Sequence, residues 1–267
     1  MLKTTVNIMQ AFQWQIEYPL DAILFDCDST LSAVEGITVL AKYNNVYPQV
    51  HALTEKAMAE TGLNAGLYRA RLDLVRPQQS QMMYVIDAYW QALTPDVDKV
   101  ITCLHALGKA VYVVSAGITQ AVVPFAERLG IAGKNVFAVN VSFDQQGHYQ
   151  RFDKHSPLTT QCGKSQIVTE LRKIHKHIAH VGDGMNDIEA AKAVDRFVGY
   201  GGSCYRESIA KLSPFYIRCL SLSPLLPLFL TRDEVTKLSP SAKTLYQRGL
   251  TYIQQDAVEF RQIVSSR

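Results

Sequence analysis

The sequence lacks several features that would indicate particular classes of protein. It has no C-x-x-C pair, and its five cysteines are odd in number and widely scattered, so neither a zinc knuckle nor a disulfide framework is predicted. It has no basic run longer than a few residues, and a net charge of +3 is too small to indicate a nucleic acid or membrane-surface partner. The most apolar run, 220–230, is broken by two prolines and is too short to span a bilayer.

The composition instead predicts a folded protein with a sizeable core. Hydrophobic residues make up 48% of the 267 residues and charged residues 19%, which is enough for one large domain or a core with a smaller module. Residues 1–18 hold one lysine and no continuous apolar stretch, so we expect no secretion signal. Scattered cysteines fit a reducing compartment, and we predict a cytoplasmic location.

Two aspartates follow the first apolar run, and the rest of the chain is organised around them. Residues 22–25 are typical of a strand that is buried on both faces. In an extended chain Asp26 and Asp28 point to the same side, where two like charges are costly unless a cation or a proton separates them. A magnesium ion would resolve this, with one carboxylate attacking and the other carrying a proton. The alternative is a strand followed by an acidic turn.

Two later apolar runs also end in polar side chains. Ser115 and Gly117 follow 110–114, and their position before a helix suits a phosphate. Asp183 and Asp187 follow a strand predicted at 178–181. Because ligands of open parallel sheets bind beyond the carboxyl ends of the strands, we expect these groups to share a site.

One lysine and three histidines near the second of these strands are further candidates for a site. Lys164 opens a predicted helix at 164–174, where a positive charge opposes the helix dipole. It is either a clamp for phosphate and carboxylate groups or a surface lysine. His175, His177 and His180 straddle a helix end and a strand, and we interpret them as surface or packing residues rather than a metal site.

A helical block follows the first strand and is typical of a lid over a site. Its helices are predicted at 33–44, 48–60, 64–75 and 79–93. Glu35 lies just past the acidic turn. Arg71 lies on the helical stripe of Leu67 and Leu74. It is either a structural residue, with a snorkelling stem or an ion-pair partner, or a guanidinium that binds a substrate carboxylate.

The predicted fold is therefore α/β: a doubly wound, Rossmann-like parallel sheet core with an inserted all-helical cap domain and a C-terminal helical extension. The predicted limits are 1–32 and 93–218 for the core, 33–92 for the cap and 219–267 for the extension. A β-hairpin is predicted at about 136–152, between strands 136–141 and 148–152. A helix over 240–264 carries one narrow apolar seam, which favours packing on the protein's own core; a homodimer contact or docking on another protein is the alternative.

Together these residues resemble the haloacid dehalogenase superfamily. D-x-D-x-T at 26–30, S-x-G at 115–117, Lys164 and G-D-G-x-N-D at 182–187 occur in the order of that family. An aspartate at position 28 implies a phosphatase. Over about residues 20–218 the chain is similar to phosphoserine phosphatases.

The resemblance implies a Mg²⁺-dependent phosphomonoesterase that hydrolyses a small phosphorylated metabolite, most simply O-phosphoserine, through an aspartyl-phosphate. Implied catalytic residues are Asp26, Asp28, Ser115 and Lys164. Implied metal-site residues are Asp26, Asp28 through its backbone carbonyl, Asp183 and Asp187. Implied substrate-binding residues are Glu35, Met58, Arg71, Ser115, Ala116, Gly117 and Asn186.

Ala59, Asn64 and Ala116 depart from the family pattern, so three further functions stay open. The same chemistry could act on another phosphorylated amine or amino acid. It could also transfer the phosphoryl group. In a different class, the chain could be an effector that binds a partner through its C-terminal tail.

Overall fold

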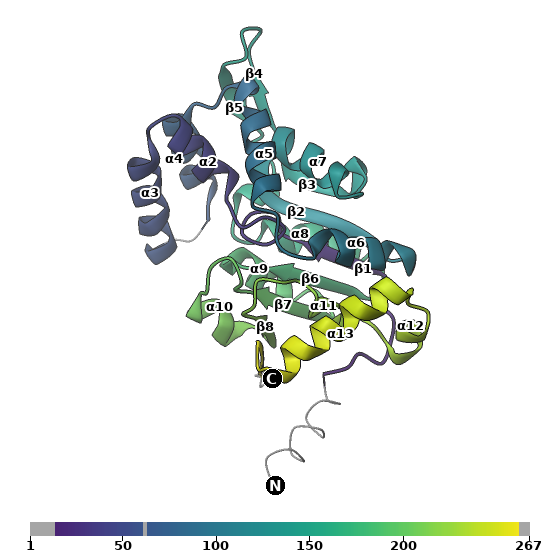
Figure 1. Ribbon diagram of the computed structural model, residues 1–267. Coiled ribbons are helices and arrows are strands. Elements are labelled where there is room, and N and C mark those ends of the chain that lie inside the picture. The colour runs from purple at the N-terminus through teal and green to yellow at the C-terminus, as the bar shows by residue number, and fades with distance from the viewer. Residues whose placement is uncertain (1–13, 61–62, 262–267) are drawn as a thin grey trace.

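A seven-stranded sheet forms the centre of the structure, a computed structural model that describes residues 14–60 and 63–261, with the side chains of 55–60 left out. The order is β3-β2-β1-β6-β7-β8-β9, and all neighbours are parallel except β8 and β9 (Figure 1). The strands are β1 (Ala22–Phe25), β2 (Ala110–Ile118), β3 (Val136–Val139), β6 (Ile178–Gly182), β7 (Arg196–Tyr200), β8 (Phe215–Ile217) and β9 (Val258–Phe260).

Strand β1 lies at the point where the strand order reverses. Its four apolar residues are fully buried, because β2 pairs with it on one side and β6 on the other. Ala22 is in register with Ala110 and with Ile178, so the carboxyl ends of the three strands lie at one edge. That edge is the crevice in which doubly wound sheets bind ligands.

Helices cover the sheet on both faces, and this confirms the predicted doubly wound class (Figure 1). Their amphipathic sequences bury one side against the strands. They are α6 (Val97–Ala106), α7 (Thr119–Arg128), α8 (Gly163–Leu171), α9 (Met185–Ala191) and α10 (Glu207–Leu212).

The predicted helical block forms a group of helices beside the carboxyl ends of the central strands (Figure 1). Its helices are α2 (Gly36–Tyr43), α3 (Tyr47–Glu60), α4 (Ala65–Val75) and α5 (Met82–Gln91). Helix α4 begins where the Asn64 side chain accepts a 2.9 Å hydrogen bond from the Leu67 N–H, and it ends at Arg76, whose φ is 44°. The domain limits at 32/33, 92/93 and 218/219 stay predictions.

The predicted hairpin is wrong in its first strand. The apolar run expected at 136–141 divides: β3 joins the main sheet parallel to β2, and the hairpin pairs β4 (Val141–Phe143) with β5 (Tyr149–Phe152). The Gln120 side chain, which hydrogen-bonds Asn140 and the Val141 carbonyl, holds the break between the strands. An uninterrupted apolar run does not reveal such a break.

The C-terminal extension is helical as predicted, with one correction. It contains α11 (Leu225–Phe229), α12 (Arg232–Thr236) and α13 (Pro240–Gln254), and α13 packs against α11 and α6. The helix predicted over 240–264 ends ten residues early, because Asp256 takes a left-handed φ of 56° and the chain then pairs as β9 with β8. Within the described ranges, no helix combines the length and apolarity of a membrane span.

Asp96 joins the extension to the core. Its carboxylate accepts hydrogen bonds from Arg248 of α13 at 2.7 and 2.9 Å and from Ser221 at 2.8 Å. Burial alone would raise the pKa of Asp96, but the bonds from Ser221, Arg248 and Lys99 lower it below the ordinary value of 3.8. The charged form of Asp96 therefore stabilises the folded state.

We predict that Asp96→Asn lowers the free energy of unfolding by about 1 kcal/mol at neutral pH. Since the folded-state pKa is lowered, this contribution is present above the unfolded pKa and is lost as the pH falls through the folded value. Urea unfolding should therefore show the full difference at neutral pH and a smaller one near about pH 3. An equal loss at both pH values, or an equal loss in the exposed control Asp98→Asn, would contradict this assignment.

Candidate active site

The two aspartates after β1 have separate environments. Asp26 is buried, and its Oδ1 accepts a hydrogen bond from the Cys27 N–H at 2.7 Å and lies 2.9 Å from Lys164 Nζ. Its Oδ2 accepts no hydrogen bond from any described residue. Asp28 Oδ1 accepts from the Gly36 N–H at 2.9 Å and from Tyr89 Oη at 2.7 Å. The two carboxylates thus differ in their hydrogen-bond partners: Asp26 lies beside a lysine, and Asp28 accepts from a backbone N–H and a tyrosine hydroxyl.

The carboxyl-terminal part of β2, which continues past the strand predicted at 110–114, lies directly against Asp28. Ser115 is fully buried, and its Oγ accepts a 2.9 Å hydrogen bond from the Gly117 N–H. A β-carbon at Gly117 would lie 3.3 Å from Asp28 Oδ2 and 2.8 Å from a Val122 methyl. Glycine at position 117 therefore allows the end of β2 to approach the turn that carries Asp28.

Lys164 joins the turn after β1 to the first turn of α9, which follows β6. This fully buried side chain places Nζ 2.9 Å from Asp26 and 2.7 Å from Asp187 Oδ1. His180 Nε2 lies 2.7 Å from the same Asp187 oxygen. Burial alone would raise the pKa of Asp187, but Lys164 and His180 lower it to about 2, so this carboxylate is charged. Lys164 is therefore a buried ion-pair partner and not a surface residue.

Three of the predicted metal-site residues come together. Carboxylate oxygens of Asp26, Asp183 and Asp187 lie within 4.8 Å of one another, and all three residues are buried. Burial raises the pKa of Asp26, and Lys164 only partly opposes this. The Asp28 carboxylate is not in the cluster, which leaves its backbone carbonyl as the predicted ligand atom.

This donor set fits a magnesium ion. Lys164 and Arg206, which binds the carboxylate of Asp183, offset only part of the negative charge that Asp26, Asp183 and Asp187 bring together. A bound cation would offset the rest. Buried carboxylate and carbonyl oxygens are the hard ligands that Mg²⁺ prefers.

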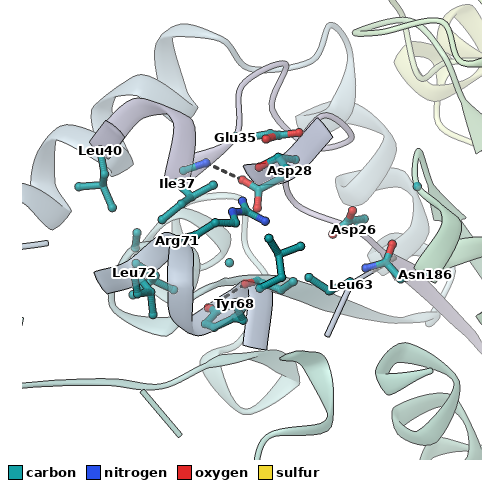
Figure 2. Close-up of a pocket in the computed structure, with 18 of the residues that line it drawn as sticks. Asp26, Asp28, Glu35, Ile37, Leu40, Leu63, Tyr68, Arg71, Leu72 and Asn186 are labelled. Atoms are coloured by element: carbon teal, nitrogen blue, oxygen red, sulfur yellow. Dashed lines mark hydrogen bonds between the residues drawn. The ribbon is translucent and has the colours of Figure 1, made fainter. Parts of the chain in front are cut away.

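A cavity opens above the carboxylates, between cap and core (Figure 2). The guanidinium of Arg71 reaches into it from α4, and Glu35 and Asn186 also line it. Arg71 Nε is buried and has no hydrogen-bond partner among the described residues. Glu35 lies 3.8 Å from Arg206. The apolar walls are formed by Ile37, Leu40, Leu63, Leu67, Leu72, Met82, Val85 and Ile118.

The structure brings most of the predicted substrate residues to this cavity. Ala116 and Gly117 line it, and Ser115 lies buried beneath. Met58 belongs to α3, but its side chain is outside the described residues. Asn64 caps α4, and its neighbour Leu63 lines the cavity instead.

Three residues of the site were not identified from the sequence. Tyr89, Arg206 and His180 contact Asp28, Asp183 and Asp187 respectively. The interpretation of His180 as a surface or packing residue misses its acidic partner. A histidine within an otherwise apolar central strand must find buried hydrogen-bond partners, and this signal was present. Tyr89 gave no such signal, because its helix shows only an apolar face.

Comparisons with known proteins agree with this arrangement. Residues 20–195 match the family model of haloacid dehalogenase-like hydrolases. Human phosphoserine phosphatase is 33% identical over 202 residues, which is 75% of this chain and 90% of that protein. The Drosophila melanogaster phosphoserine phosphatase is 33% identical over 198 residues, or 73% of each chain. A solved structure of a phospho-aspartyl intermediate analogue of phosphoserine phosphatase has a TM-score of 0.69 at 25% identity, and covers 80% of this chain and 100% of that chain.

The chain belongs to the haloacid dehalogenase-like hydrolases, as its four motifs predict. Its relatives and its fold define it further as a phosphoserine phosphatase-like phosphoric monoester hydrolase.

We predict that Lys164→Met lowers the free energy of unfolding by about 3–5 kcal/mol, because two buried carboxylates lose their cation. Mg²⁺ should recover part of this loss, since an ion that binds only the folded state stabilises it. Denaturant unfolding with and without Mg²⁺ measures both effects. In the control Lys192→Met, an exposed ion pair with Glu189 is removed, and a change within about 0.5 kcal/mol is expected. Equal effects of the two substitutions would contradict the buried-pair assignment.

Proposed function

We propose that this enzyme hydrolyses O-phosphoserine to serine and phosphate through an aspartyl-phosphate on Asp26, with Mg²⁺ as cofactor. One observation carries the proposal. The Asp26 oxygen that receives no hydrogen bond from a described residue, the carboxyl of Asp28 and the Arg71 guanidinium with its unpaired Nε all lie at one cavity.

In the first half of the reaction, Asp26 Oδ2 attacks phosphorus and the bond from phosphorus to the ester oxygen breaks. Asp28 Oδ2 gives its proton to that oxygen, and serine leaves. Burial raises the pKa of the Asp28 carboxyl, although the Tyr89 hydroxyl partly lowers it. A raised pKa favours the proton-bearing form that a general acid requires, and such assistance is worth about 10²–10⁴-fold.

In the second half, a water attacks phosphorus and gives a proton to Asp28. The bond from phosphorus to Asp26 breaks and phosphate leaves. The Ser115 hydroxyl, the N–H groups of its loop and Lys164 Nζ would bind the phosphoryl oxygens. Asp187 orients Lys164 through their 2.7 Å ion pair.

The carboxylates of Asp26 and Asp183 and the backbone carbonyl of Asp28 would hold the Mg²⁺, with Asp187 beside them. When bound, the ion supplies positive charge that neutralises the phosphoryl group in the transition state. Arg206 holds Asp183 in place from its other side.

The amino acid part of the substrate would lie in the cavity under the cap. Arg71 would bind the carboxylate, since a guanidinium with a buried, unpaired N–H gains most from a bidentate partner. Glu35 would bind the ammonium group, and Met58, Ala116, Gly117 and Asn186 would surround the substrate. The apolar walls favour, as the second candidate, another phosphorylated amino acid handled by the same residues.

The C-terminal extension packs on the protein's own core, with α13 against α11 and α6. An effector role or a homodimer through the extension stays a prediction. Transfer of the phosphoryl group to an acceptor other than water also stays a prediction. The cytoplasmic location is also a prediction, and all five cysteines are free thiols.

We predict that the purified enzyme releases phosphate from O-phosphoserine faster than from other phosphate esters, and only with Mg²⁺. Asp26→Asn should lower kcat by about 10⁴-fold or more while the circular dichroism spectrum stays unchanged. A malachite-green assay over a metabolite panel, with and without EDTA, measures this. Near-native turnover by Asp26→Asn would end the covalent mechanism.

We predict that Arg71→Ala raises KM for O-phosphoserine about 10- to 100-fold, the value of a charge-assisted carboxylate pair. KM for p-nitrophenyl phosphate, which has no carboxylate, should change little. The matched control is Arg69→Ala, two residues away on α4, with its guanidinium over the Phe152 ring instead of in the cavity. If Arg71→Ala raises KM for both substrates alike, Arg71 does not bind the carboxylate.

A further inference from the structure

Two donors converge on a single oxygen of Asp28. Gly36 N–H donates to Oδ1 at 2.9 Å, and Tyr89 Oη donates to the same atom at 2.7 Å. The other oxygen, Oδ2, lies close to Gly117, beside the proposed phosphate-binding residue Ser115. The two oxygens of one carboxyl group are therefore unequal.

This inequality decides which oxygen carries a proton. An oxygen that accepts two hydrogen bonds is stabilised as an acceptor, and protonating it would remove one of them. The proton of the neutral carboxyl therefore resides on Oδ2. Oδ2 is the oxygen that lies near Gly117, where the leaving group must receive the proton.

Tyr89 acts as a permanent donor. It is fully buried on α5, and a tyrosine hydroxyl keeps its proton at neutral pH, so it can donate to Asp28 at 2.7 Å. Its ring packs on Phe125 of α7, with ring centroids 5.0 Å apart, which anchors the side chain to the core.

The hydroxyl reaches Asp28 through a gap at Gly36. A β-carbon on Gly36 would lie 2.5 Å from Tyr89 Oη, closer than any such contact allows, so only glycine leaves the room. Gly36 thus contributes twice, through its N–H and through its missing side chain. Both contributions come from the first turn of α2, while the tyrosine comes from α5, the last cap helix.

We propose that Tyr89 is a positioning residue for proton transfer: by occupying Asp28 Oδ1, it directs the proton-carrying Oδ2 to the ester oxygen. The inference rests on the proposed function. As the bond from phosphorus to the ester oxygen breaks, the O–H bond on Oδ2 breaks and its proton moves to the departing oxygen. The charge left on Asp28 is then stabilised by the hydrogen bonds from Tyr89 and Gly36.

The test separates proton transfer from mere stability by varying the leaving group. Tyr89→Phe keeps the ring and removes the hydroxyl. It should lower kcat/KM about 10- to 100-fold for O-phosphoserine and for β-glycerophosphate, whose alkoxide leaving groups need a proton. For p-nitrophenyl phosphate, whose leaving group is a stable anion, the loss should be under about threefold.

Two variants calibrate this result. Asp28→Asn should also lower kcat/KM more for the alkyl esters than for the aryl ester, and by a larger factor than Tyr89→Phe. Tyr112→Phe removes a hydroxyl that lies away from the cavity and forms a 2.8 Å hydrogen bond with His175. This variant should leave kcat/KM unchanged for all three substrates. Equal losses on alkyl and aryl esters in Tyr89→Phe, or no loss, would overturn the proposal.

Gly36→Ala provides a second, independent route. The added methyl must displace Tyr89 Oη, so this variant should reproduce the leaving-group pattern of Tyr89→Phe. In the Tyr89→Phe background the same alanine should add little, because the atom it would strike is gone. Fully additive losses would contradict the role assigned to the hydroxyl.

The outcomes also separate this inference from the proposed function. If the wild type does not hydrolyse O-phosphoserine, or if Asp28→Asn fails to discriminate between leaving groups, the proposed substrate or the proposed general acid is wrong. In the first case the β-glycerophosphate to p-nitrophenyl phosphate ratio in Tyr89→Phe still tests the positioning role. In the second case the positioning role fails together with the general acid.

Discussion

The burial of negative charge is the constraint on which the rest of the structure depends. The parallel register of β1 and β6 places Asp26, Asp183 and Asp187 at one edge of the sheet, with little access to water. Lys164 between two of these carboxylates, and Arg206 on the third, reduce the repulsion without removing it. The negative charge that remains is why we propose a divalent cation at this site, and we expect an anionic phosphate to bind there only when the cation is present.

In the mechanism we propose, the helical cap contributes to the chemistry as well as covering it. Its α4 supplies Arg71 to the cavity, and Tyr68 of the same helix donates a 3.0 Å hydrogen bond to the Ala116 carbonyl beside Ser115. Its first and last helices supply the two donors on Asp28 Oδ1. The proposal therefore links cap placement to proton transfer, because displacing α2 or α5 would release the carboxyl to which it assigns the proton.

The groups to which we assign the chemistry were predictable from sequence because each lies at the end of a buried apolar run. Asp26, Ser115 and Asp183 are local signals of this kind, and the topology of a parallel sheet brings them together. Tyr89 was not predictable, since it meets Asp28 across 61 residues and its helix pattern shows only which face is apolar. The C-terminal strand β9 was missed for a similar reason: the helical spacing continues to Phe260, but pairing with the open edge of β8 overrides it.

The most direct test of the central claim is a crystal structure of the enzyme soaked with Mn²⁺ in place of Mg²⁺, with the ion located by anomalous scattering. We predict one strong peak between the carboxylates of Asp26 and Asp183, within bonding distance of the Asp28 carbonyl. No peak at that edge of the sheet under saturating Mn²⁺, or a peak only elsewhere, would contradict the claim.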